Sequence, residues 1–213
     1  MHHHGLRIWD KAFGAKRRAE ARSTLRHAAD FLEPGSSVLD IGCGIGYALE
    51  VLNNELDCAG YGCDVVDPPM DIARFVRFDG TRLPYKDLSF DVALIVFVLH
   101  HADDPGVLLR EASRVARRAV IVVEDTPRSG VEERWGHMHI RSFAARHGIP
   151  WHGRVRREDE WRQVFQFCGM DVLQVERLRR FERLPPVSRS VFALLPAHAA
   201  AAQEIALKRA ATS

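Results

Sequence analysis

Three glycines and two aspartates near the start of the chain have the types and the spacing that bind a small polar ligand. The glycines are Gly42, Gly44 and Gly46, between an apolar run and an amphipathic segment. Without a Cβ atom they let the backbone turn tightly and approach a ligand, next to the free N–H groups that begin a helix. Asp40 precedes the first glycine, and Asp64 ends the next apolar run, where nucleotide-binding folds carry a ribose-binding carboxylate. The pattern predicts a nucleotide-binding turn.

The spacing of the glycines also distinguishes between cofactors. Dinucleotide-binding turns have two residues between their last two glycines, whereas here Ile45 alone separates Gly44 from Gly46. A carboxylate at Asp40 would repel a pyrophosphate. The same carboxylate suits S-adenosylmethionine, which carries a sulfonium and an ammonium and has no phosphate. We therefore expect S-adenosylmethionine as the cofactor and S-adenosylhomocysteine as the product.

These residues resemble the class I S-adenosylmethionine-dependent methyltransferases, of the type that methylates small molecules. The resemblance covers residues 36–125 through Val38–Gly46, Asp64, Phe78–Gly80, Leu83–Tyr85, Ser89–Leu94, Leu99–His101 and Leu109–Val115. It implies a cofactor site made of Asp40, Gly42, Cys43, Gly44, Gly46, Asp64, Val65, Asp79, Gly80 and Phe97. Asp64 would accept bonds from the ribose hydroxyls, Asp79 from the adenine amino group, and Asp40 would face the cationic methionine part. For each of these carboxylates, the alternative is a helix cap or a turn residue.

The elements that position these residues alternate between strand and helix. Strands are predicted at 37–41, 59–64, 75–78, 92–98 and 119–124, and helices at 47–53, 105–115 and 158–168. Such alternation is typical of a doubly wound α/β fold with a parallel sheet. The resemblance implies a seven-stranded, mostly parallel, Rossmann-like sheet, whose last two strands lie at 170–175 and 188–195.

The whole chain, residues 1–213, is predicted to form a single methyltransferase domain, because 213 residues with 46% hydrophobic ones are enough for one α/β core. Its parts are an N-terminal helical cap at 9–33, the cofactor-binding core at 36–125, a substrate-binding insertion after strand 5 at 125–155, and a tail at 197–213. The four cysteines form no C-x-x-C pair, and no apolar run is long enough to span a membrane. These features predict a cytoplasmic protein with reduced thiols.

The N-terminal cap has a basic face that also bears on possible partners. This face contains Lys11, Lys16, Arg17, Arg18, Arg22 and Arg26. It would suit an anionic partner, but a charged run of this kind is more often a solvated helix face. A formal net charge of +2 is too close to balance to indicate nucleic acid by itself.

Histidines and arginines of the insertion are candidates for acceptor binding and proton transfer. Methyl transfer is an in-line displacement that depends mainly on alignment, and it needs a base where the nucleophile is a hydroxyl. The catalytic candidates are His137, His139 and His100, and the substrate-binding candidates are His101, Arg128, Arg134 and Arg141. Packing and substrate contact are the alternative roles of the histidines. Two histidines two positions apart point the same way only on a strand, so no metal is predicted.

The methyl acceptor is predicted to be a small molecule, anionic or aromatic. After the fourth predicted strand the chain lacks the Asx-Pro-Pro-aromatic motif typical of enzymes that methylate the amino groups of adenine or cytosine. No cysteine lies where a pyrimidine C5 nucleophile would be expected. A basic and aromatic insertion suits a carboxylate or phosphate next to a flat apolar part. Two alternatives stay open: an RNA methyltransferase, and a catalytically silent partner subunit that binds S-adenosylmethionine.

Overall fold

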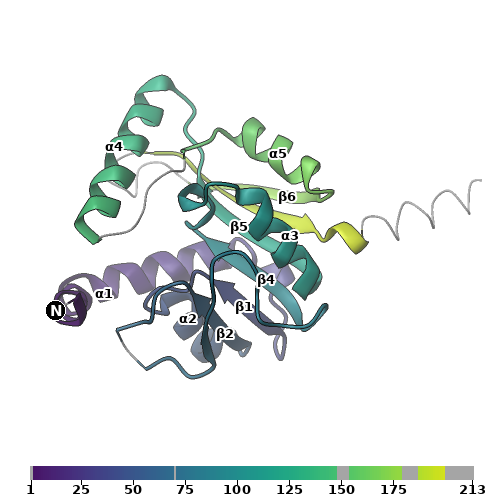
Figure 1. Ribbon diagram of the computed structural model, residues 1–213, viewed down its shortest axis with the longest axis horizontal. Coiled ribbons are helices and arrows are strands. Elements are labelled where there is room, and N and C mark those ends of the chain that lie inside the picture. Colours follow the sequence, from purple (N-terminus) through teal and green to yellow (C-terminus); the bar gives the residue numbers. More distant parts are fainter. Residues whose placement is uncertain (1, 70, 148–153, 179–186, 200–213) are drawn as a thin grey trace, which may run out of the picture.

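A seven-stranded sheet forms the centre of the protein, whose computed structural model describes residues 2–69, 71–147, 154–178 and 187–199 (Figure 1). The strands are β1 (Ser37–Ile41), β2 (Ala59–Asp64), β3 (Phe75–Arg77), β4 (Phe90–Val96), β5 (Ala116–Asp125), β6 (Asp171–Leu178) and β7 (Arg189–Leu195). Their order is β3-β2-β1-β4-β5-β7-β6, and β7 runs antiparallel to both of its neighbours. The predicted mostly parallel sheet is therefore confirmed.

Helices cover both faces of this sheet. They are α1 (His2–Arg26), α2 (Tyr47–Glu55), α3 (Pro105–Val115), α4 (Gly130–His147) and α5 (Glu158–Phe167), with 3-10 turns at Ala29–Phe31 and Leu99–His101. One apolar core joins side chains of α1 and α2 to Val38 and Val92, and the other joins α3 and α5 to Leu39 and Ala93. Neighbouring residues of a strand point to opposite faces, so the central strands supply both cores. None of the described helices has the length and apolar character needed to cross a bilayer.

The parallel strands bring their carboxyl ends to one edge of the sheet. Ile41 of β1 pairs with Cys63 of β2 on one side and with Ile95 of β4 on the other. The residues that follow these strands therefore meet at the same edge, where ligands bind in open α/β sheets.

Several boundaries differ from the predicted ones. The first helix ends at Arg26, and a separate 3-10 turn follows it, so the single helical cap at 9–33 was wrong in detail. β4 ends at Val96 because Phe97 has a φ of +58°, which no regular strand contains. The insertion contains the 18-residue helix α4, while residues 148–153 of it and 200–213 of the predicted tail lie outside the described residues.

The basic face of α1 binds an acidic face of α2. Arg18 donates to Glu50 at 2.7 Å, and Arg22 donates to Glu55 at 2.5 Å. The two arginines are accessible to solvent, as predicted for this face, and they are also paired within the chain.

Candidate active site

The glycine turn after β1 lies against the end of β2. The N–H groups of Gly42 and Cys43 donate to the carbonyl of Cys63 at N···O distances of 2.7 and 3.1 Å. Gly42 has a φ of +76°, and a Cβ atom at this position would collide with the side chain of Val98. Gly44 has a φ of +54°, with open space where its Cβ would lie. The first glycine is therefore required by packing, and the second leaves room for a ligand.

Two carboxylates flank this turn. Asp40 is buried in β1, and burial, followed by the charge of Asp64, raises its pKa to about 7. Asp64 ends β2 and accepts N–H bonds from Gly44 at 2.9 Å and from Val66 at 3.2 Å. Because the charge of Asp64 disfavours the charged form of Asp40, a cationic ligand group near both would stabilise that form. The structure thus brings the two predicted acids together beside the glycine turn.

The residues predicted to surround adenine gather at the ends of β2 and β3. Val65 is exposed, and its Cγ1 lies 3.2 Å from the position that a Cβ on Gly80 would take. The Oδ1 atom of Asp79 accepts bonds from the N–H of Arg82 and from the N–H and hydroxyl of Thr81, which lower the pKa of Asp79. The turn role that was the alternative for Asp79 is therefore present. It leaves the second carboxylate oxygen able to accept further bonds.

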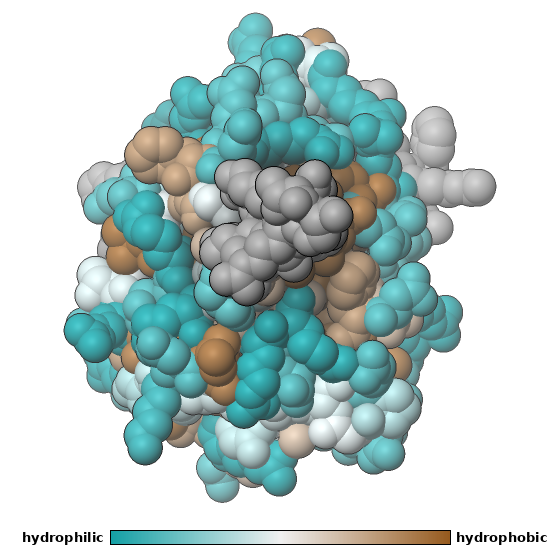
Figure 2. Space-filling view, turned by 90° about the vertical axis from the view of Figure 1, so that its right-hand side faces the viewer, coloured by the Kyte–Doolittle hydropathy of each residue, from teal (hydrophilic) through white to brown (hydrophobic). Residues whose placement is uncertain are grey.

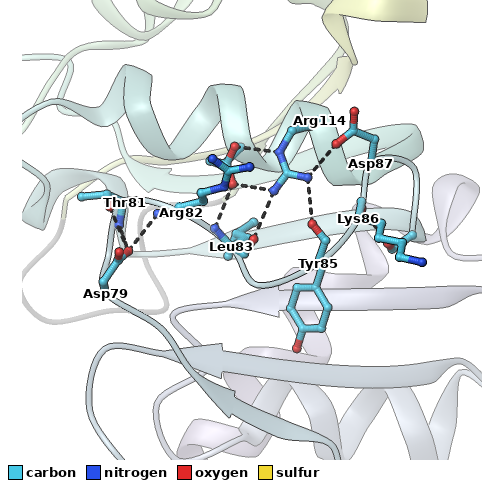
Figure 3. A network of polar contacts seen from close by, with 10 residues as sticks. Asp79, Thr81, Arg82, Leu83, Tyr85, Lys86, Asp87 and Arg114 are labelled. Carbon is cyan, nitrogen blue, oxygen red and sulfur yellow. Dashed lines mark hydrogen bonds and ion pairs between the residues drawn. The ribbon is translucent and has the colours of Figure 1, made fainter.

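A network of polar contacts holds the segment between β3 and β4 (Figure 3). Arg114 of α3 donates to the carbonyl of Tyr85 and to the carboxylate of Asp87, both at 2.8 Å, and to the carboxylate of Glu111 at 2.6 Å. Glu111 in turn accepts the N–H of Leu83 at 2.8 Å. The bonds to Glu111 and Asp87 raise the pKa of Arg114. Two segments that carry the family resemblance, 83–85 and 109–115, are therefore bonded to each other. These bonds fix the loop that follows Asp79.

A buried arginine that the sequence analysis missed organises the ends of β5 and β7. Arg189 donates from Nε to Asp125 at 3.0 Å and from Nη1 to Glu20 of α1 at 2.9 Å. Its guanidinium carbon lies 3.6 Å from the centroid of the Phe97 ring. Burial lowers the pKa of Arg189 to about 10, with Asp125 acting in the opposite direction. The signal in the sequence was an arginine at the start of a mostly apolar strand.

The strand-four histidines occupy two different environments. His100 is buried, with Nδ1 at 2.6 Å from Glu124, whose other carboxylate oxygen accepts the N–H of Leu99 at 2.8 Å. Burial lowers the pKa of His100, but the charge and hydrogen bond of Glu124 outweigh it and raise the pKa. The ring of His101 lies 4.2 Å from that of His100, and burial followed by this neighbour lowers its pKa to about 4. His101 is therefore a neutral imidazole at pH 7.

The remaining predicted site residues lie on α4 or directly before it. Arg128, Arg134, Arg141 and His139 are exposed, whereas His137 is half-buried. Because α4 is a helix, His137 and His139 project in different directions. Among the described residues, no three His, Cys, Asp or Glu side chains are grouped so that they could hold a metal ion. The structure does not bring the two histidines of α4 together as a pair.

A buried acid that the sequence analysis also missed, Glu132, anchors α4 to β7. Its Oε2 atom accepts the N–H of Arg128 at 3.2 Å and the N–H of Ser188 at 3.0 Å. A buried carboxylate that accepts backbone N–H bonds is held in one position by them. The start of α4 is thereby fixed next to the ends of β5 and β7.

Sequence comparisons place the chain in a known family. The family described as "Methyltransferase domain" matches residues 13–175, more than half of the chain. "Probable tRNA methyltransferase 9B" of Mus musculus is 36% identical over 90 residues, which cover 40% of this chain and 20% of the relative. 27-O-demethylrifamycin SV methyltransferase of Amycolatopsis mediterranei (strain S699) is 32% identical over 129 residues, which cover 54% of this chain and 47% of the relative. The chain thus spans a fifth to a half of the length of these curated relatives.

A solved structure agrees with this assignment at the level of the fold. A SAM-dependent methyltransferase from Thermotoga maritima matches with a TM-score of 0.64 at 19% identity, covering 91% of this chain and 97% of that one. The residues present also fit S-adenosylmethionine, because buried Asp40, neighbouring Asp64 and the open side of Gly44 suit a cationic ligand without phosphate. The chain belongs to the methyltransferase domain family, whose members use S-adenosylmethionine as the cofactor.

Proposed function

We propose that this protein transfers the methyl group of S-adenosylmethionine to a small organic molecule. The observation that carries the choice of acceptor is the pairing of α1 with α2. Arg18 and Arg22 belong to the basic face of α1 that would suit an RNA backbone, and they bind Glu50 and Glu55 of α2 instead. The similarity to a rifamycin methyltransferase over 129 residues supports the same choice.

We assign each residue around the glycine turn and the ends of β2 and β3 a role in cofactor binding. Asp64 accepts the ribose hydroxyls with the lone pairs that Gly44 and Val66 leave, and Asp40 provides negative charge near the methionine part. Val65 and Gly80, which lie in contact with each other, form one wall of the adenine site, with Asp79 beside it. Cys43 and Phe97, in the turns that follow β1 and β4, complete the lining.

When bound, S-adenosylmethionine supplies an activated methyl group that an acceptor nucleophile displaces in line. The protein's own contribution is to hold the acceptor and to accept its proton where the nucleophile is a hydroxyl. We assign acceptor contact to His101 and Arg128, and proton acceptance to either His137 or His139, since α4 presents them in different directions. His100 is held by Glu124, so its role in the proposal is to position the turn that carries His101.

The second candidate, an RNA methyltransferase, is favoured by the 36% identity to a tRNA methyltransferase over 90 residues and by exposed arginines of α4. A third, a catalytically silent partner subunit, would keep the cofactor site and lack turnover.

Turnover with methyl-labelled S-adenosylmethionine and fractionated cell extract separates the three candidates. We expect label in the small-molecule fraction, unchanged after nuclease treatment of the extract. Label that nuclease removes would identify RNA as the acceptor. Cofactor binding by calorimetry without label in any fraction would identify the silent subunit.

A further inference from the structure

The outward face of α4 carries an apolar stripe that no part of the described structure covers. Val131, Trp135 and Met138 are 64, 47 and 55% exposed. They lie at positions i, i+4 and i+7, which share one face of a helix. Gly136 and Ile140 lie on the opposite, buried face, where a Cβ on Gly136 would touch Val155. Packing within the fold therefore accounts for the buried residues on the inner face of α4. It does not account for the three exposed apolar side chains on the outer face.

Positive charge borders this stripe. Arg134 and Arg141 are exposed, and neither forms an ion pair with any residue that the structure describes. The two acids of α4 are both engaged elsewhere: Glu132 is buried on backbone N–H groups, and Glu133 pairs with Arg157 at 3.1 Å. The outer face of α4 thus combines apolar side chains with positive charges that have no compensating carboxylate on the helix.

We propose that the outer face of α4 docks onto an anionic lipid surface. A helix that lies in a membrane interface has Trp and aliphatic side chains on one face and arginines beside them. Trp135 suits this position because an indole ring prefers the boundary between headgroups and hydrocarbon. At an anionic lipid surface the headgroups would pair with Arg134 and Arg141, and the hydrocarbon boundary would take up the apolar stripe.

The attachment would bring the bilayer next to the candidate active site. Residues 126–129 alone separate the end of β5 from the start of α4, and α4 lies at one end of the molecule beside that edge of the sheet (Figure 1). Figure 2 shows the opposite side of the molecule from α4. On that face hydrophilic side chains predominate, and hydrophobic ones form smaller groups between them. This docking does not depend on which acceptor is methylated.

The test is binding to vesicles. The probes are phosphatidylcholine vesicles with and without about 30% phosphatidylglycerol, an anionic lipid. We expect the full chain to sediment with the anionic vesicles, and the fluorescence of Trp135, identified by its loss in Trp135→Phe, to shift to the blue. Arg134→Gln with Arg141→Gln should weaken binding about 30-fold, because each basic residue contributes about fivefold near an anionic surface. Trp135→Ser with Met138→Ser should weaken it at least about tenfold.

The matched control is Phe167→Ser with Leu173→Ser, which removes two side chains that are 84 and 50% exposed on α5 and β6. Binding of this control should equal that of the unmodified chain. Circular dichroism and the melting temperature of every variant show that the exposed substitutions leave the fold intact. No binding to anionic vesicles, equal binding to both vesicle types, or equal loss in the control would each overturn the proposal. A dimer of the unmodified chain that Trp135→Ser with Met138→Ser converts to a monomer would assign the stripe to a second copy instead.

Discussion

The two halves of the candidate site are built in different ways. In the glycine turn and the loop of Asp79, backbone N–H groups bind carboxylates that lie at most 20 residues away, as Gly44 does with Asp64. At the ends of β4, β5 and β7, buried side chains bind each other across the chain. Arg189 reaches Asp125 over 64 residues and Glu20 over 169 residues.

This difference explains what each half does for the protein. A turn held by its own backbone keeps its shape when ligand enters or leaves, which suits a cofactor that every family member shares. Buried ion pairs between distant elements hold α1, β5 and β7 together, so they tie the acceptor half to the stability of the fold.

The first prediction concerns the buried pair. Arg189→Met should lower the free energy of unfolding by about 3 kcal/mol, because it takes the buried arginine away from the half-buried carboxylates of Asp125 and Glu20. Urea denaturation measures this loss. The matched control is Arg177→Met, which breaks an exposed pair with Glu158 and should leave the denaturation midpoint almost unchanged. Equal effects of the two substitutions would remove the contrast between the halves.

The second prediction concerns the histidines of α4. His137→Ala with His139→Ala should lower the methylation rate about 100-fold or more, because a general base contributes at least that factor. Cofactor affinity should change little, since both residues lie on α4 and not at the glycine turn. The exposed His27 provides the control, as His27→Ala should keep the full rate. A loss within a factor of about two in the double variant would leave alignment as the source of catalysis.

The third prediction concerns Asp64. Asp64→Ala should weaken S-adenosylmethionine by about 1.5 to 3 kcal/mol, the range for hydrogen bonds to a charged group. Isothermal calorimetry gives the affinity, and Asp67→Ala is a control on the same loop, where the carboxylate is exposed and pairs with Arg77. Unchanged affinity in Asp64→Ala would exclude this carboxylate from ribose binding.

The fourth prediction follows from the raised pKa of Asp40. Its ionised form is disfavoured by burial and by Asp64, so the group binds a proton near pH 7 in the free protein. A cationic cofactor needs the ionised form, so its affinity should fall about tenfold between pH 8 and pH 6. The raised pKa also means that Asp40 favours the folded chain at low pH and that this contribution is lost as the pH rises through about 7. Asp40→Asn should bind with an affinity that varies much less over this range.

The same contrast shows what the sequence made predictable. The first five strands along the chain, the glycine turn and the meeting of Asp40 with Asp64 follow from periodicity and spacing, which report local backbone geometry. The seven-stranded, mostly parallel arrangement was implied by the family resemblance. The pairing of Arg189 with Asp125 and Glu20 could not be predicted, because no local pattern records which distant side chains share a buried space. α4 was not predicted because its buried face includes Glu132 and Gly136, which give a weak helical pattern.

The last and smallest effect concerns α1, which contacts both halves. Its Glu20 binds Arg189, while Arg18 and Arg22 bind Glu50 and Glu55 of α2. The pairs with α2 are accessible to solvent and screened by salt, so Arg18→Gln with Arg22→Gln should lower the melting temperature only slightly at low salt and hardly at all at high salt. Thermal denaturation at two salt concentrations measures this. Glu20→Gln, which removes one partner of a buried arginine, should lower the melting temperature more and with less dependence on salt. If Arg18→Gln with Arg22→Gln lowered the melting temperature more than Glu20→Gln, α1 would belong to the cofactor half of the site and would not connect the two halves.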